Sequence, residues 1–432
     1  MRPVTRWFGR AAALCGAFGA AAALPGAARA DELVPALTLQ TGAAFTRSPG
    51  NNQNGFFIAA TPQLGYYFGS DRTQVGIAGS VTASLDTALP NGIASTLSLT
   101  IAHDIAPTTR LLLGASVLQS SVGNYLLVKR TADTQVSGLS TLNSQLGTLT
   151  LTEGLRHEIS ENVTLSQSVS GTYVRSLDLD VRLDNYILGA VIGAERSWTF
   201  DALGAELNVE YARSIVPPLV RSRAIVLSLG PTWDHDFSRS WTSSVGIAAA
   251  VAFSPDEGTK TQVAPAGRAS FLYYTDGGSG ASLAYAGGFE PNLFLGTILR
   301  AHQVTLRAYT PISDVHRVLL SVSGGFLRAT TLDLREGANG NEFDAVLHDA
   351  EISWGLADFL NLSLRYQFVG QTAGSGLGAT PPLVRHAAIL GLDIFGGGRP
   401  TKPRVQTRFP QRVDGGDAPP VDKPLPASPN RR

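Results

Sequence analysis

The segment from Leu360 to Phe368 alternates strictly between apolar and polar residues, and it constrains the fold of this chain more than any other feature. A period of two is the period of a pleated strand whose two faces meet different surroundings. Similar segments recur from Val34 to Phe395, so the sequence predicts an all-β fold. The alternation alone does not identify the face that meets water, because a water-soluble antiparallel sheet shows it too.

The first 30 residues have the three parts of a cleaved secretory signal peptide. Arg2, Arg6 and Arg10 precede an uncharged, small and apolar stretch, and Ala28-Arg29-Ala30 offers a cleavage site before Asp31. A retained membrane anchor is the alternative, but the stretch is short and alanine-rich. Cleavage removes the single Cys and the single Met, so disulfides cannot stabilise the mature chain.

No later stretch approaches the roughly 18 consecutive apolar residues that a membrane helix needs. A closed barrel is the other architecture that satisfies every backbone group inside a membrane. If the chain enters a membrane, we therefore expect it to do so as a β-barrel.

Turn residues divide the region 31–396 into hairpins of two kinds. Tight turns are predicted near residues 69–72, 106–108, 160–162, 199–201, 237–239, 276–278, 313–315 and 357–358. Longer connections alternate with them at residues 48–54, 88–92, 123–141, 178–180, 217–221, 255–259, 290–296, 335–341 and 371–382. This plan predicts a transmembrane, antiparallel, up-and-down β-barrel of about 18 strands, with 16 as the alternative, short periplasmic turns and longer outer loops.

The aromatic residues provide an independent indication of a membrane. Trp198, Trp233, Trp241 and Trp354 all lie within a few residues of a predicted tight turn. Barrels place amphipathic rings in girdles at the lipid interfaces, whereas a soluble sandwich would bury its tryptophans in mid-strand. We therefore predict that these four residues belong to an aromatic girdle.

Charge is distributed unevenly, although Lys and Arg together number 34 and Asp and Glu together also number 34. Residues 1–30 contain Arg and no acid, and residues 397–432 are rich in Pro and Arg. The region 31–396 is therefore acidic. The basic segment 397–432 shows no apolar periodicity, which predicts a disordered periplasmic tail with peptidoglycan or a periplasmic protein as a potential contact.

Six charged residues are expected to face the lumen of the barrel. They are Glu206, Glu210, Arg307, Asp349, Glu351 and Arg365. The turn at Ala357-Asp358 makes two strands adjacent, so Arg365 should lie beside Asp349 or Glu351. Such charges either line a pore that sorts ions or neutralise one another and stiffen the wall. The overall excess of acid favours a mild preference for cations.

The longest predicted loop, residues 123–141, contains Tyr125, Lys129, Arg130 and Asp133. One hypothesis is that it folds inward and narrows the pore, as the third outer loop of general porins does. The alternative is that it extends a hairpin above the membrane. Loops of this length in compact domains are usually either functional or disordered.

Nothing in the chain predicts catalysis or a cofactor. The seven histidines are scattered without the spacing of a metal-ligand pair, and no nucleophile motif or phosphate-binding loop is visible. We therefore expect no enzyme activity, no metal, no cofactor and no nucleic acid partner.

The signal, the alternating strands, the girdle residues and the even number of hairpins together resemble those of bacterial outer-membrane porins and porin-like barrels. The resemblance covers most of the chain but is architectural, because no family-specific motif is present. It implies residence in the outer membrane, contact with its lipid and with its assembly machinery, and passive transport of small hydrophilic solutes or ions. Exopolysaccharide secretion and a structural or adhesive barrel with a closed lumen are the alternatives. The sequence does not predict the oligomeric state.

Overall fold

The computed structural model describes residues 32–48, 51–70, 72–87, 92–121, 145–177, 184–216, 220–255, 261–275, 277–292, 297–313, 317–332, 342–372 and 382–396. The expected signal peptide and basic tail lie outside these ranges. The strands are β1 (Glu32–Ser48), β2 (Asn51–Gly69), β3 (Thr73–Asp86), β4 (Gly92–Ala106), β5 (Thr109–Ser121), β6 (Gln145–Ser160), β7 (Val163–Ser176), β8 (Asp184–Ser197), β9 (Asp201–Val216), β10 (Val220–Asp236), β11 (Trp241–Phe253), β12 (Gln262–Tyr274), β13 (Gly280–Asn292), β14 (Thr297–Ser313), β15 (Val318–Leu332), β16 (Glu342–Ala357), β17 (Leu360–Gln371) and β18 (Leu383–Phe395).

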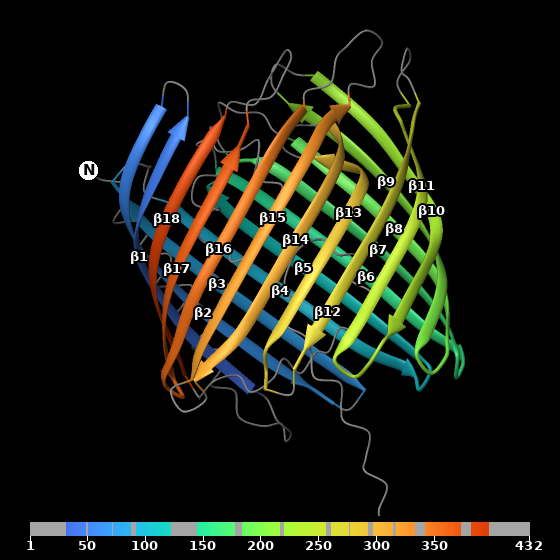
Figure 1. The fold of residues 1–432 in the computed structure, drawn as a ribbon, viewed down its shortest axis with the longest axis horizontal. Coiled ribbons are helices and arrows are strands. Elements are labelled where there is room, and N and C mark those ends of the chain that lie inside the picture. Colours follow the sequence, from blue (N-terminus) through green and yellow to red (C-terminus); the bar gives the residue numbers. More distant parts are fainter. Residues whose placement is uncertain are drawn as a thin grey trace, which may run out of the picture.

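These strands form one closed antiparallel barrel (Figure 1). Each strand pairs with its neighbours in sequence, and β1 pairs with β18 from Ala36 opposite Phe395 to Arg47 opposite Val384. The strand number is 18, as predicted, and not the alternative of 16. Each predicted tight turn falls between two successive strands. The start of β1 and the end of β18 therefore both lie at the rim formed by the tight turns.

The two faces of the wall have opposite chemistry. On β17, Leu364 and Tyr366 are 57% and 45% exposed, whereas Arg365 and Gln367 between them are 6% and 5% exposed. Large apolar side chains cover the outside, and polar side chains point inward. A soluble sheet would bury the apolar face, so this inversion places lipid around the barrel.

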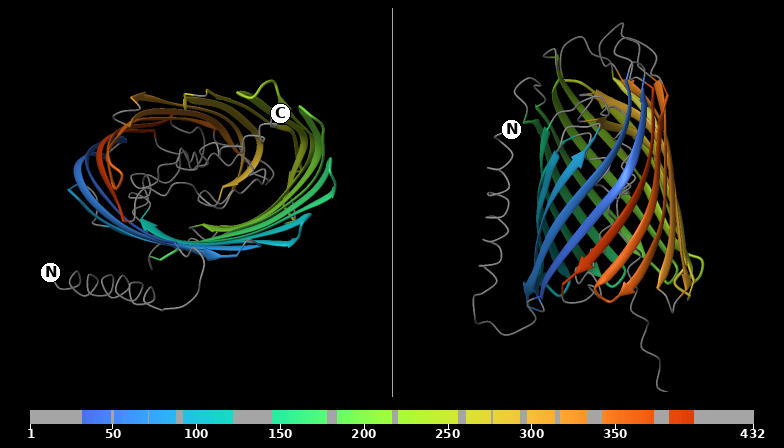
Figure 2. Two further views of the ribbon diagram at one scale, coloured as in Figure 1. Left: turned by 90° about the horizontal axis from the view of Figure 1, so that it is seen from below. Right: turned by 90° about the vertical axis from the view of Figure 1, so that its left-hand side faces the viewer.

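The outer ends of β13 and β14 leave the wall and enter the lumen (Figure 2, left). The pairing of β12 with β13 stops at Gly267 opposite Gly287, although β12 continues to Gln262 along β11. Beyond this point β13 contacts β10 and β11, and β14 contacts β10, although none of these pairs are neighbours in the barrel order. We call residues 288–292 and 297–301 the inward hairpin.

Gly288 lies at the bend of the inward hairpin and adopts a φ of +154°. A side chain is strained in this conformation, and a Cβ atom at Gly288 would lie 3.0 Å from the Cβ of Ala266. Glycine therefore lets β13 turn inward past β12.

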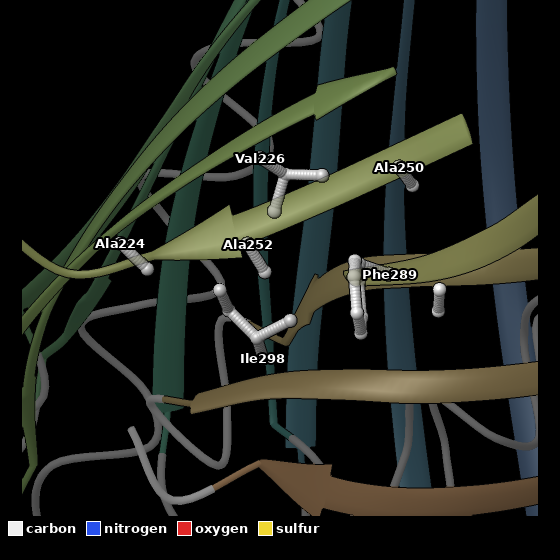
Figure 3. Close-up of a cluster of buried hydrophobic side chains, with 7 residues drawn as sticks. Ala224, Val226, Ala250, Ala252, Phe289 and Ile298 are labelled. Atoms are coloured by element: carbon white, nitrogen blue, oxygen red, sulfur yellow. The ribbon is translucent and has the colours of Figure 1, made fainter. Parts of the chain in front are cut away.

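One face of the inward hairpin packs against the inside of the wall (Figure 3). Phe289 and Ile298 join Val226, Ala250 and Ala252 in a cluster in which every residue is buried. Small alanines on β10 and β11 provide the flat surface that receives the two larger side chains. This packing holds the hairpin inside the barrel.

None of the described residues belongs to a helix long and apolar enough to cross a membrane.

Candidate functional site: the inner wall of the barrel

A buried ion pair joins β16 and β17 on the inner wall. Arg365 lies opposite Glu351 in the register of the two strands, and its guanidinium binds the carboxylate of Asp349. The side chains of Arg365 and Asp349 are 7% and 15% exposed. Because burial removes most of the water from both side chains, each charge is stabilised mainly by the other. Arg365 therefore lies beside one of the two acids, as the sequence predicted.

A second inner pair crosses several strands. Arg268 on β12 donates from Nη1 and Nη2 to the two carboxylate oxygens of Glu206 on β9, at 3.2 and 2.8 Å. Strands β10 and β11 lie between them. The bridge passes over Gly246, where a Cβ would lie 3.2 Å from the Cγ of Arg268. A bidentate pair of this kind braces a sector of the wall.

The remaining charged candidates also point inward. Glu210 is 1% exposed and accepts a hydrogen bond of 3.2 Å from Nδ2 of Asn208. Arg307 lies between Ser282 of β13 and Ser323 of β15. The six residues therefore do not form one cluster, because they are distributed over β9, β14, β16 and β17.

Openness to solvent differs around the lumen. Inward-facing Gln63, Thr96, Thr152 and Ser168, on β2, β4, β6 and β7, are exposed. By contrast, inward-facing side chains near the outer ends of the strands are buried and mostly apolar, such as Ala252 and Ala329 at 0% exposure. The inner wall is thus wet and polar at mid-height along β2–β7, whereas its outer end is packed.

The inward hairpin is the narrowing element that sequence reasoning missed. The predicted constriction residues Tyr125, Lys129, Arg130 and Asp133 lie outside the described residues, so their hypothesis stays a prediction. Residues 290–296 were expected to form an outer loop, yet Glu290 pairs with Leu299. The sequence signal was the pair Gly287-Gly288, because adjacent glycines inside a strand often mark a bend.

The tryptophans predicted as a girdle face outward near the tight turns. Trp198, Trp233, Trp241 and Trp354 are 48%, 38%, 48% and 45% exposed. Trp233 donates from Nε1 to Asp201 at 3.0 Å, and the ring of Trp241 lies 4.5 Å from that of Tyr273. Partly exposed rings, one of which donates a hydrogen bond, suit the boundary between lipid and water.

Histidines on the outer surface are also held by neighbouring strands. His103 and His157 form hydrogen bonds of 2.8 Å with Thr73 and Thr109. In the part of the chain that the structure describes, no group of three or more His, Cys, Asp or Glu residues could hold a metal ion.

Aromatic residues on the inner wall differ in how deeply they are buried. Phe57 and Phe343 are each 2% exposed. The rings of Tyr67 and Tyr309 lie over Gly76 and Gly280, where a Cβ would come within 3.0 and 2.5 Å of them. All four rings contribute to the wall, but Tyr67 is 36% exposed and leaves part of its ring free for stacking.

The closed ring, the apolar outer surface and the polar inner wall define the chain as a bacterial outer-membrane β-barrel of porin-like architecture. No family model and no curated protein matches it. Similar solved structures include OccK2 (OpdF) of Pseudomonas aeruginosa in complex with glucuronate, at 11% identity and a TM-score of 0.46 over 84% of this chain and 98% of that one. OccK7 (OpdD) of the same organism is 14% identical, with a TM-score of 0.44 over 84% and 99% of the two chains.

A further similar structure is the ferric-catecholate import receptor Fiu of E. coli, which is 10% identical with a TM-score of 0.44 over 85% of this chain and 82% of its own. Likenesses this distant, all with TM-scores below 0.5, leave the function of this chain to its own residues.

Proposed function

We propose that the barrel is a channel for passive transport of small hydrophilic solutes or ions across the outer membrane. The observation that carries this proposal is the wet, polar inner wall along β2–β7 inside a closed ring of 18 strands. Barrels of 16–18 strands are wide enough to leave an aqueous channel unless something fills it. The inward hairpin occupies the opposite side, along β10–β12, so the passage follows β2–β7.

The charge of the inner wall supports a mild preference for cations. Inward-facing acids outnumber inward-facing bases among the described residues, and Arg365 and Arg268 are each bound to an acid. Glu195 and Asp234 add negative charge on β8 and β10. A wall of low dielectric constant focuses this net charge into the lumen, where it attracts cations.

Secretion of a polysaccharide is less well supported. A sugar polymer would need exposed aromatic rings along its path, and of the four inner rings described above only Tyr67, beside the end of β2, is exposed. A closed structural or adhesive barrel would not need a solvent-exposed polar inner wall at mid-height.

Planar-bilayer recording on the full chain tests the proposal. We expect stable open steps, and we expect T96W to lower their conductance because Thr96 faces the passage. The matched control is L97W, one residue along β4, because Leu97 faces lipid and is 45% exposed. Electrical silence of the wild-type protein in many insertions would contradict the channel and favour the closed barrel. Block by an added polysaccharide at low concentration would favour secretion instead.

A further inference from the structure

One sector of the outer surface lacks aromatic residues. Strands β3, β4, β5 and β6 contain no Phe, Tyr or Trp, whereas each of the other strands contains at least one. Between Phe68 and Tyr173 the only aromatic residue of the sequence is Tyr125. The girdle of the tight-turn rim is therefore interrupted over these strands. Because girdles form where a barrel wall meets lipid headgroups, the gap marks a sector with a different neighbour.

A carboxylate lies in the apolar belt on β6, the last strand of this gap. Glu153 on β6 faces outward and is exposed, between Leu113 of β5 and Val169 of β7 in the register. His157 lies four residues toward the periplasmic rim, and Leu149, opposite Tyr173, lies four residues toward the outer rim. Glu153 is thus midway between two interfacial positions. No hydrogen bond or ion pair joins it to another described residue, and lipid tails offer no donor.

The neighbouring strand provides an amide at the same depth. Gln167 on β7 also faces outward and is exposed, two residues from Val169 toward the periplasmic rim. The strands lean so that each step to a higher-numbered strand rises toward the outer rim (Figure 1). Val169 therefore lies higher than Glu153, its partner on β6. With a strand tilt of about 35–45°, this difference in height offsets much of the descent of two residues from Val169 to Gln167 along β7. Glu153 and Gln167 therefore lie side by side within a few ångströms of the same height.

We propose that this surface of β5–β7 binds a second copy of the chain in a two-fold dimer. A two-fold axis along the membrane normal leaves each residue at its own depth in the membrane. In the facing copy the left-to-right order of Glu153 and Gln167 is reversed, so Gln167 of each copy donates to Glu153 of the other. Both hydrogen bonds form at once because the two residues are adjacent, as an isologous contact requires. A ring of three or more copies would instead use two separated surfaces on each barrel. Ala115 and Gly171, small residues that face outward just above Glu153, let the second wall approach.

Sedimentation of the full chain in mild detergent tests the dimer. We expect the wild type to sediment as a dimer, and E153L or Q167L to raise the dissociation constant at least about tenfold, because each removes two hydrogen bonds to a charge. The exchange variant E153Q/Q167E should restore dimerisation. If lipid covers Glu153, E153L will leave a monomer unchanged, and that result overturns the proposal.

Cysteine cross-linking in vesicles tests the same contact without detergent. In a C15S background, V169C should form a disulfide between two copies, because Val169 lies next to the predicted axis. L390C on β18 is the matched control, since Leu390 is 45% exposed and Val169 is 49% exposed. Equal cross-linking of the two variants, or cross-linking of V169C only to another protein, contradicts the dimer. Neither test depends on conductance, so failure here leaves the proposed channel intact.

Discussion

The contribution of a charged side chain to stability depends on which face of the strand it occupies. Arg365 and Arg328 are two arginines with acidic partners, but Arg365 is buried inside the wall whereas the side chain of Arg328 is 61% exposed on the outer face. Arg328 lies only four residues before the outer end of β15, where water solvates both charges, so its exposed pair gains little. A buried pair is different, because removing one partner leaves the other charge without water or a counterion.

We predict that R365L lowers the free energy of unfolding by about 3–5 kcal/mol, the range for breaking a buried pair. Unfolding by urea in detergent micelles measures it. The double variant R365M/D349L should recover most of the loss, because no charge is then left alone. R328L is the matched control, and we expect a change of at most about 1 kcal/mol. Equal effects of R365L and R328L would show that the inner pair is solvated.

At the scale of elements, the sequence predicted the barrel well because alternation and turn residues are local. The tight turns and the strand number follow from residues a few positions apart. The inward hairpin was not predictable in the same way, because it depends on Phe289 and Ile298 meeting alanines on β10 and β11. Such contacts across the lumen leave no periodic signal. Likewise, the pairing of Arg268 with Glu206 could not be predicted, because β12 and β9 are not adjacent strands.

The bend leaves an edge on β12, where residues 262–266 pair with β11 alone. Pro265 lies in this segment, and proline, which has no N–H to donate, is tolerated at such an edge. The local chemistry of β12 thus agrees with the departure of β13.

We predict that F289A/I298A releases the inward hairpin and raises the single-channel conductance. The two side chains are 7% and 2% exposed, and truncation removes the packing that holds the hairpin against the wall. Single-channel recording should show larger or noisier steps. The control is F326A on β15, because Phe326 faces outward and is 43% exposed. If F289A/I298A leaves the step unchanged, the hairpin does not limit the passage.

For the whole molecule, we predict that cations permeate better than anions. The reversal potential in a salt gradient measures the ratio, and E195Q/D234N should move it toward one, because both acids face inward. D344N is the control, since Asp344 faces outward. The preference should also weaken at about 1 M salt, where the Debye length is about 3 Å. Equal permeability of the two ions at low salt would rule out the preference.

The pairing of the first strand with the last sets the order in which this molecule must assemble. Thr38 donates a hydrogen bond of 2.7 Å to Asp393, a residue 355 positions further along the chain. Until Leu383–Phe395 has been synthesised, β1 and β17 are open edges, and backbone groups without partners are costly in a membrane. Contacts this distant in sequence also form slowly. The sheet therefore gains its membrane-compatible form only at the last step, and a chain truncated before Leu383 keeps two adhesive edges however well its other hairpins are made.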